Sequence, residues 1–293
     1  MTRESTPRIR CRQISDSDIP AVVQLLAKGF PHRSPAYWAR AMQRLAQRDA
    51  PAPYPRFGYL LEFEGAAVGV IVLIFSARSM NNEAHIKCNI SSWYVEPIHR
   101  GYASFLIAAA LRHKGVTYVN ISPAVHTWPT IEAQGFVRYS FGQIIAFPAL
   151  GARVANTCVR PFEPGYPYGP SLAGDERDIL TAHLDYGCHT YIVTENGRAN
   201  PFIFQARRIL RRRIPILQLV YCRDVRDFAR LAGPIGRELM KSGVLIVALD
   251  AVGPLPGLVG KYFPDRGGRR YFKGPDHPHI GDLTFSEMVL FGL

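Results

Sequence analysis

The stretch from Ile86 to Lys114 constrains the fold more than any other, because it predicts a strand, a tight turn and a helix in immediate succession. Ile86 to Val95 is rich in β-branched and aromatic residues, which favours a buried strand. Pro97 cannot donate to a strand ladder and ends it. Apolar residues at helical spacing, followed by basic ones, predict a helix over Ser104 to His113. A strand, a small-residue turn and a helix direct free backbone N–H groups to one point, which is typical of a phosphate site.

The turn resembles a known signature. Val95-x-Pro97-x-x-Arg100-Gly101-x-Ala103 is similar to the acetyl-CoA motif R/Q-x-x-G-x-G/A of the GNAT N-acetyltransferase superfamily, with Phe105 at the second small position. The resemblance implies that backbone N–H groups from Arg100 to Ser104 hold a pyrophosphate, and that the irregular strand end before Pro97 polarises a thioester carbonyl. The implied acyl-CoA-binding residues are Trp93, Tyr94, Val95, Arg100, Gly101, Tyr102, Ala103, Ser104 and Phe105.

The order of predicted elements extends this resemblance over roughly Arg8 to Ala149. The order is strand, two helices, three strands, helix, strand, helix and strand, and Gln134-Gly135-Phe136 stands where the family usually has its terminal G-F. The family commonly places a tyrosine four residues before that glycine as the general acid. Here the residue is Ile131, which cannot donate a proton. Either Tyr139, Tyr102 or a water serves instead, or this half is not a standard acetyltransferase.

A second domain is expected after a segment with four prolines and several glycines. Its predicted elements are a hairpin, a strand over Ile214 to Cys222, a helix over Val225 to Lys241 and another strand, which repeat the order of the first half. We therefore expect an α/β protein with two tandem GNAT-like domains, each a mixed central sheet flanked by helices. The expected boundaries are 1–150 for the acyl-CoA-binding domain, 151–174 for a linker and 175–293 for the second domain. The turn from Arg223 to Arg226 has no glycine and carries acidic charge, so no cofactor site is expected there.

Two candidate proton-transfer residues flank the end of the strand predicted over Val116 to Ile121. His126 and Glu132 are near the place where the resemblance implies an acceptor, and either could be the general base. Tyr139 is a candidate acid, and Glu83 and His85 are weaker candidates. For each histidine the alternative is a surface residue without a catalytic role. No H-E-x-x-H, paired-cysteine or carboxylate-cluster pattern occurs, so no metal is expected.

The formal net charge of +12 favours an anionic partner. The densest basic cluster, Arg207 to Arg213, is interpreted as a solvated surface or as a site for an anionic substrate. Nucleic acid is the least favoured partner, because no base-stacking aromatics or recognisable module accompany the charge. Homo-oligomerisation is left open by the sequence.

The five cysteines form no C-x-x-C pair, and the polar N-terminus has no apolar signal segment. The longest apolar run, Ala66 to Phe75, is shorter than the roughly 20 residues that span a bilayer. We therefore expect a soluble, cytoplasmic protein without a membrane segment.

The sequence thus favours an acyltransferase that moves an acetyl or other acyl group from coenzyme A to an amine or hydroxyl of a small-molecule or peptide acceptor, which could be anionic. The alternative is a degenerate GNAT fold that acts as a non-catalytic binding or regulatory module, for which Phe105 and Ile131 argue. A third hypothesis is a basic nucleic-acid binder, which strongly salt-dependent binding would support.

Overall fold

The structure is a computed structural model that describes residues 9–80, 83–209, 214–267 and 269–292. The chain forms two compact units, which we describe separately. Unit 1 contains the described residues up to Ile121 together with Lys273–Asp276 and Phe285–Gly292. Unit 2 contains Ser122–Phe272 and His277–Thr284.

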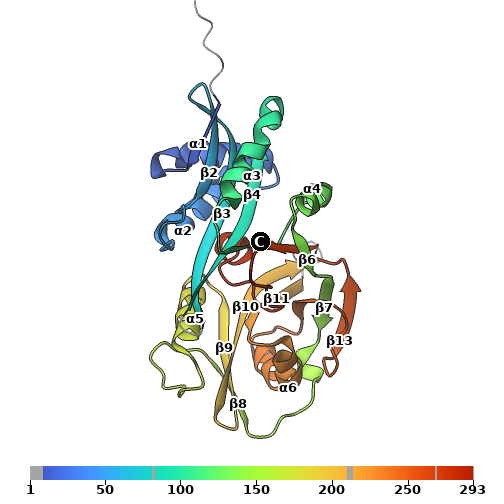
Figure 1. The fold of residues 1–293 in the computed structure, drawn as a ribbon. Coiled ribbons are helices and arrows are strands. Elements are labelled where there is room, and N and C mark those ends of the chain that lie inside the picture. Colours follow the sequence, from blue (N-terminus) through green and yellow to red (C-terminus); the bar gives the residue numbers. More distant parts are fainter. Residues whose placement is uncertain (1–8, 81–82, 210–213, 268, 293) are drawn as a thin grey trace, which may run out of the picture. The chain divides into compact units, whose positions relative to one another are not determined.

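Unit 1 is built on a sheet with strand order β1-β2-β3-β4-β5 (Figure 1). Neighbouring strands are antiparallel except β4 and β5, which are parallel. The strands are β1 (Ile9–Gln13), β2 (Gly58–Phe63), β3 (Ala66–Met80), β4 (Glu83–Val95) and β5 (Val116–Asn120). The helices are α1 (Ile19–Gly29), α2 (Pro35–Gln47) and α3 (Ala103–Leu111), with short helices η1 (Asp16–Asp18), η2 (Pro97–Tyr102) and the π-helix η5 (Met288–Gly292).

Helices α1 and α3 pack on opposite faces of this sheet. His113, just after α3, lies 3.0 Å from the Tyr59 hydroxyl, and Tyr59 is opposite Ile71 in β3. Gly29 at the end of α1 packs against Tyr94, which is opposite Val70. Successive residues of a strand point to opposite faces, so the two helices cover both sides of β3 and β4.

Helix α2 begins and packs as its sequence predicts. The Ser34 hydroxyl accepts a hydrogen bond from the Tyr37 N–H at 3.2 Å, and Pro35 occupies the first helical position. Trp38 and Leu45 lie on the buried face. The Trp38 ring contacts Phe291 of η5 at a centroid distance of 6.2 Å, so the segment Phe285–Gly292 completes the core of unit 1.

Unit 2 contains a second sheet with strand order β13-β7-β12-β11-β10-β9-β8 (Figure 1). Its strands are β7 (Gly142–Ala146), β8 (Thr157–Pro161), β9 (His189–Glu195), β10 (Arg198–Ile209), β11 (Ile214–Cys222), β12 (Val247–Ala251) and β13 (Gly260–Pro264). Strands β6 (Val137–Ser140) and β14 (Arg270–Lys273) are an antiparallel pair and end the strand order of the first sheet, β1-β2-β3-β4-β5-β14-β6. The helices are α4 (Trp128–Ala133), α5 (Gly174–Asp185) and α6 (Val225–Lys241), with short helices η3 (Val125–Thr127) and η4 (Pro148–Leu150).

Helix α6 covers one face of the second sheet. Its buried residues, Phe228, Leu231, Ile235 and Leu239 among them, form one apolar core with strands β7 and β9 to β12. Gly233 and Gly236 let α6 approach the backbone around η4, because a Cβ at either residue would come within 2.1 Å of a backbone atom there. The sheet is therefore apolar on its α6 face.

The two units repeat one arrangement, which confirms the expectation of two mixed sheets flanked by helices. In unit 1, hairpin β2-β3 is followed by β4, α3 and the parallel strand β5. In unit 2, hairpin β9-β10 is followed by β11, α6 and the parallel strand β12. Both hairpins turn on two left-handed residues, Glu64-Gly65 and Asn196-Gly197, which suit the twist of the flanking strands.

The division between the units differs from the expected boundary at residue 150. Residues 137–147 were predicted to be the final strand pair of the first sheet. Strand β6 does belong to that sheet, beside β14, but β7 lies between β12 and β13 in the second sheet. The expected linker, 151–174, contains β8, an edge strand paired with β9. Alternating apolar residues predict that a segment is a strand, but they do not identify its partner.

Two further features bear on the expectations from composition. In the described part of the chain, no helix has both the length and the apolar character needed to cross a membrane. All five cysteines are free thiols.

Candidate functional site

The pairing between strands β4 and β5 ends halfway along β4. Their parallel pairing runs from Ile86 opposite Val116 to Asn89 opposite Val119. Strand β4 continues for six residues beyond Asn89, to Val95, and keeps its other neighbour, β3. The second half of β4 therefore has one edge that is not paired with β5.

This second half of β4 is also irregular. Ile90 is opposite Leu73 and Trp93 is opposite Ile71, so two residues of β4 face one residue of β3. Such a bulge leaves a backbone group without a ladder partner and changes the direction of the strand. The irregularity that the sequence predicts over Ser91 to Val95 is present in the structure.

The turn after β4 leads through η2 into the N-terminus of α3. In the described part of the chain, no side chain caps α3 at its N-cap residue, Tyr102. Arg100 and Gly101 are exposed, and a Cβ at Gly101 would meet no atom within 4 Å. An uncapped helix N-terminus with open space before it fits a phosphate group, because its N–H groups and the helix dipole both favour negative charge.

Phe105 is not buried in the core. Its side chain is 46% exposed and leans on Tyr102, with the two ring centroids 6.1 Å apart. Its backbone carbonyl accepts a weak hydrogen bond from the Cys11 thiol at 3.7 Å. The bulky residue at the second small position of the motif therefore lies on the outer surface of α3.

Two polar groups at the divergence of β4 and β5 have no partner. Both side-chain atoms of Asn89 and the Nε1 of Trp93 are buried and form no hydrogen bond with any residue the structure describes. Asn89 is only 2% exposed. A buried amide without partners costs free energy and calls for an explanation. Asn89 was not among the predicted site residues. Its signal in the sequence is a single polar side chain between Cys88 and Ile90 in a buried strand.

The three predicted proton-transfer residues all belong to unit 2, whereas the predicted acyl-CoA residues all belong to unit 1. His126 is exposed in η3. Glu132 in α4 accepts hydrogen bonds from the Tyr271 hydroxyl at 2.6 Å and from Arg269 at 3.0 Å. Glu132 thus joins a polar cluster with residues far along the chain.

Tyr139 packs in the interior of unit 2, where it is 3% exposed and meets Phe272 edge to face. Burial raises the pKa of its phenol well above the ordinary value, and the positive charge of Arg270 opposes this only in part. A phenol with a raised pKa holds its proton at neutral pH, so Tyr139 can donate a proton but not accept one.

In unit 1, His85 forms a pair with a carboxylate. His85 Nδ1 lies 3.1 Å from Asp276 Oδ2, and the Thr117 hydroxyl donates to the same carboxylate oxygen at 3.3 Å. His85 precedes Ser91 by six residues of β4, which is about 20 Å at roughly 3.3 Å per residue. That distance is too long for direct proton transfer at the bulge, so His85 remains the weaker candidate.

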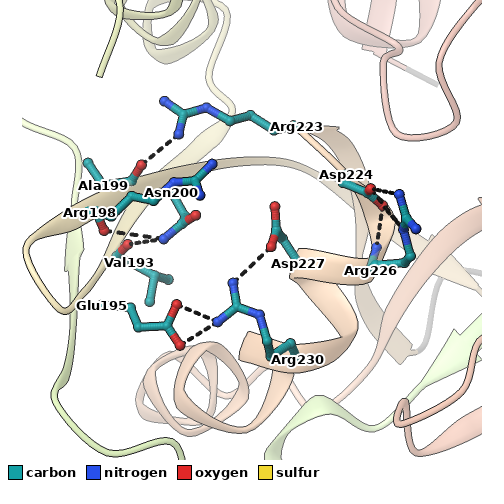
Figure 2. Close-up of polar contacts among 10 residues, drawn as sticks. All are labelled: Val193, Glu195, Arg198, Ala199, Asn200, Arg223, Asp224, Arg226, Asp227 and Arg230. Carbon is teal, nitrogen blue, oxygen red and sulfur yellow. Dashed lines mark hydrogen bonds and ion pairs between the residues drawn. The ribbon is translucent and has the colours of Figure 1, made fainter. Parts of the chain in front are cut away.

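The corresponding turn of unit 2, between β11 and α6, is closed by its own side chains. The Asp224 carboxylate accepts from the Arg226 N–H at 2.8 Å and so caps α6 (Figure 2). It also forms an ion pair with the Arg226 guanidinium at 2.6 Å. Hydrogen bonds from the Arg226 side chain and backbone hold the pKa of Asp224 below its usual value. A charged carboxylate therefore stands where a phosphate would bind.

Further ion pairs surround this turn. Arg230 in the first half of α6 pairs with Asp227 at 2.8 Å and with Glu195 of β9 (Figure 2). Arg223 donates to Glu176 through Nε at 2.6 Å and to the Ala199 carbonyl at 2.9 Å. In unit 1 the equivalent helix start is open, whereas in unit 2 it is capped and ringed by paired charges.

The described residues contain no group of three or more His, Cys, Asp or Glu side chains placed to hold a metal ion.

Comparisons with known proteins identify the fold through structure rather than sequence. No protein-family model matches the chain, and no curated protein sequence matches it significantly. A GCN5-related N-acetyltransferase from Anabaena variabilis aligns with a TM-score of 0.58 and 13% identity, over 91% of this chain and 72% of that one. A GCN5-related N-acetyltransferase from Kribbella flavida aligns with a TM-score of 0.56 and 15% identity, over 91% and 71%. The glucosamine N-acetyltransferase region of a fungal multi-domain β-N-acetylglucosaminidase aligns with a TM-score of 0.58 and 12% identity, over 92% and 38%.

Proposed function

Because the chain has the GNAT fold, we propose that it is an acyltransferase that moves an acyl group from coenzyme A to an amine or hydroxyl, and that unit 1 holds the acyl-CoA. One observation carries this proposal. The half of β4 that has left β5 runs through a bulge and leads directly to the open N-terminus of α3. The strand end and the turn thus supply unpaired backbone groups in sequence, which an extended thioester substrate with a pyrophosphate can use.

The turn binds the pyrophosphate mainly through its backbone. N–H groups from Arg100 to Ser104 donate to the phosphate oxygens, and the positive end of the α3 dipole adds to the attraction. The exposed guanidinium of Arg100 is a secondary, solvent-screened contribution. Tyr102 and Phe105 line the outer side of the same turn.

The strand end from Trp93 to Val95 positions the thioester. A backbone N–H freed by the bulge donates to the thioester carbonyl oxygen, where negative charge develops when the acceptor attacks the carbonyl carbon. The new bond to the acceptor forms as the bond to the CoA sulfur breaks, and the acceptor loses a proton. The buried amide of Asn89 supplies both a donor and an acceptor close to this point for the substrate or for a bound water.

The proton-transfer residues remain proposals from the sequence. Glu132 presents a partly exposed carboxyl group, which suits a general base, and His126 is the second candidate. Tyr139 keeps its proton at neutral pH, so only the acid role is open to it, and burial makes its phenol a weaker acid than an exposed tyrosine. For the acceptor we propose a small molecule or peptide, and the net charge of +12 supports an anionic one.

A second candidate function is a binding or regulatory module without catalysis. Ile131 favours it, because an aliphatic and buried side chain occupies the position at which the family resemblance implies a proton-donating tyrosine. This alternative keeps the acyl-CoA site and removes only the chemistry.

Calorimetric titration with acetyl-CoA and with longer acyl-CoAs tests the binding part of the proposal. Release of free CoA thiol in the presence of amine acceptors, small polyamines and peptide N-termini among them, tests the chemistry. Binding with acceptor-dependent thiol release supports the acyltransferase. Saturable binding without thiol release for any acceptor supports the module, and the absence of binding contradicts both.

A further inference from the structure

The second sheet has a polar face opposite α6. Gln143 of β7 faces Asp250 of β12 across an antiparallel pair, and Gln218 of β11 is level with Ala248 of β12. These side chains point away from the apolar core that α6 shares with Ile144, Leu219 and Leu249, because neighbouring residues alternate between faces. Gln143, Gln218 and Asp250 are all buried. A row of buried polar groups across three strands requires a set of partners.

The buried ion pair between Asp250 and Arg270 supplies most of the hydrogen-bond partners of this row. Arg270, 2% exposed, donates to Asp250 through Nε at 2.7 Å and through Nη2 at 3.2 Å. Gln143 Nε2 donates to the same carboxylate at 3.0 Å. Asp250 thus receives three hydrogen bonds, and its charge is matched by that of Arg270.

Arg207 of β10 adds a second positive charge beside this pair. It is partly buried, and its Nη1 donates to Gln218 Oε1 at 3.1 Å. No carboxylate among the described residues forms an ion pair with it. Burial lowers the pKa of Arg207, and the charges of Arg270 and Arg266 lower it further against the opposing effect of Asp250. The site therefore carries positive charge in excess of its acidic groups.

A partly buried guanidinium without a carboxylate partner is destabilising unless something binds it. We infer that the polar face of the second sheet binds an anionic ligand group, a carboxylate or a phosphate, with Arg207 as its main ligand residue. The planar guanidinium presents parallel N–H donors that match either group. Gln218 orients the guanidinium through its amide oxygen, and the exposed Arg266, 5.0 Å from the Phe263 ring centroid, adds positive charge at the rim.

This inference does not rest on acyl transfer, and its test uses no acyl-CoA. The full chain is titrated calorimetrically with sodium succinate and, separately, with inorganic phosphate at constant ionic strength. We compare the wild type with Arg207→Gln and with the control Arg226→Gln, which removes an exposed arginine that is already paired with Asp224. One probe is expected to bind saturably to the wild type and the control, and at least tenfold more weakly to Arg207→Gln. The probe that binds identifies the ligand as a carboxylate or a phosphate. Failure of both probes, or equal binding by Arg207→Gln, overturns the inference.

Thermal unfolding without ligand provides a second test. Removal of a partly buried charge that has no carboxylate partner is expected to leave the unfolding temperature of Arg207→Gln equal to that of the wild type or above it. Arg270→Gln is the matched comparison, because it breaks the buried ion pair with Asp250 and is expected to lower the unfolding temperature. A decrease for Arg207→Gln as large as that for Arg270→Gln would assign Arg207 a structural role and overturn the inference.

Discussion

Gly29, the last residue of α1, lies directly against the ring of Tyr94 in β4, so that a Cβ at residue 29 would come within 2.4 Å of Tyr94 Cγ. Real Cβ atoms do not approach other atoms so closely, and the obstructing atoms belong to the base of the tyrosine side chain rather than to a flexible end. The end of α1 thus fixes the position of Tyr94, a predicted acyl-CoA residue next to the bulge.

Gly29→Ala should therefore displace Tyr94 and weaken acyl-CoA binding. Overpacking of this kind costs about 1–3 kcal/mol, whereas alanine in place of glycine inside a helix returns about 1 kcal/mol. We expect a net loss of up to about 2 kcal/mol in the free energy of unfolding, measured by denaturant titration. The control is Gly253→Ala, because a Cβ at Gly253 would meet no atom within 4 Å. Equal acyl-CoA affinity in Gly29→Ala and the control would show that the position of Tyr94 does not affect acyl-CoA binding.

Asn89→Leu should stabilise the fold and impair function. Replacement of a buried amide without partners by an apolar side chain of similar shape removes an uncompensated desolvation cost of about 1–3 kcal/mol. If the amide contacts acyl-CoA or a bound water, the same change should weaken acyl-CoA affinity about tenfold or more, as measured by calorimetry. A variant that is less stable and binds acyl-CoA normally would show that Asn89 has a purely structural role.

Asp224→Ala should lower the stability of unit 2 without affecting acyl-CoA binding. Loss of the N-cap of α6 costs about 1 kcal/mol at neutral pH. Hydrogen bonds from Arg226 lower the pKa of Asp224 in the folded chain, so its contribution is present above the unfolded value of 3.8 and is lost as the pH falls through the lower folded value. The difference in unfolding temperature between wild type and variant should therefore shrink below about pH 4. A difference that grows with acidity would contradict this account of the turn.

Much of the fold could be predicted from the local sequence. The predictions that were wrong have a common cause. Helix α6 and strand β11 occupy the predicted residues, Val225–Lys241 and Ile214–Cys222, because a long amphipathic pattern, an Asp N-cap and a continuous apolar run define them. Strand β7 was assigned to the wrong sheet, and the short strands β13 and β14 were missed. Pairing between distant segments depends on the tertiary structure. A strand of four or five residues is too short for its sequence to indicate its partner.

In the candidate site too, local features were predictable from the sequence and features that depend on tertiary contacts were not. The turn at Arg100 and Gly101 was predictable, because proline, glycine and small residues favour a turn. The irregular strand end was implied by the resemblance to the family, and the bulge in β4 agrees with it. Asn89 was missed, since its lack of partners is visible only once its surroundings are known. Unit 1 also needs Lys273–Asp276 and Phe285–Gly292, so a chain cut near residue 150 would disrupt both units and cannot test the acyl-CoA site.

Gly101→Val tests the central claim that the turn before α3 binds acyl-CoA through its backbone. Gly101 does not have a left-handed φ, and a Cβ there would meet nothing within 4 Å, so valine should fold without strain. Its effect on binding then reports how closely the ligand approaches. Calorimetric titration with acetyl-CoA should give 1:1 binding to the wild type, a moderate loss of affinity in Arg100→Ala and a much larger loss in Gly101→Val. Binding that Arg100→Ala abolishes and Gly101→Val leaves intact, or no binding to the wild type at all, would contradict the account.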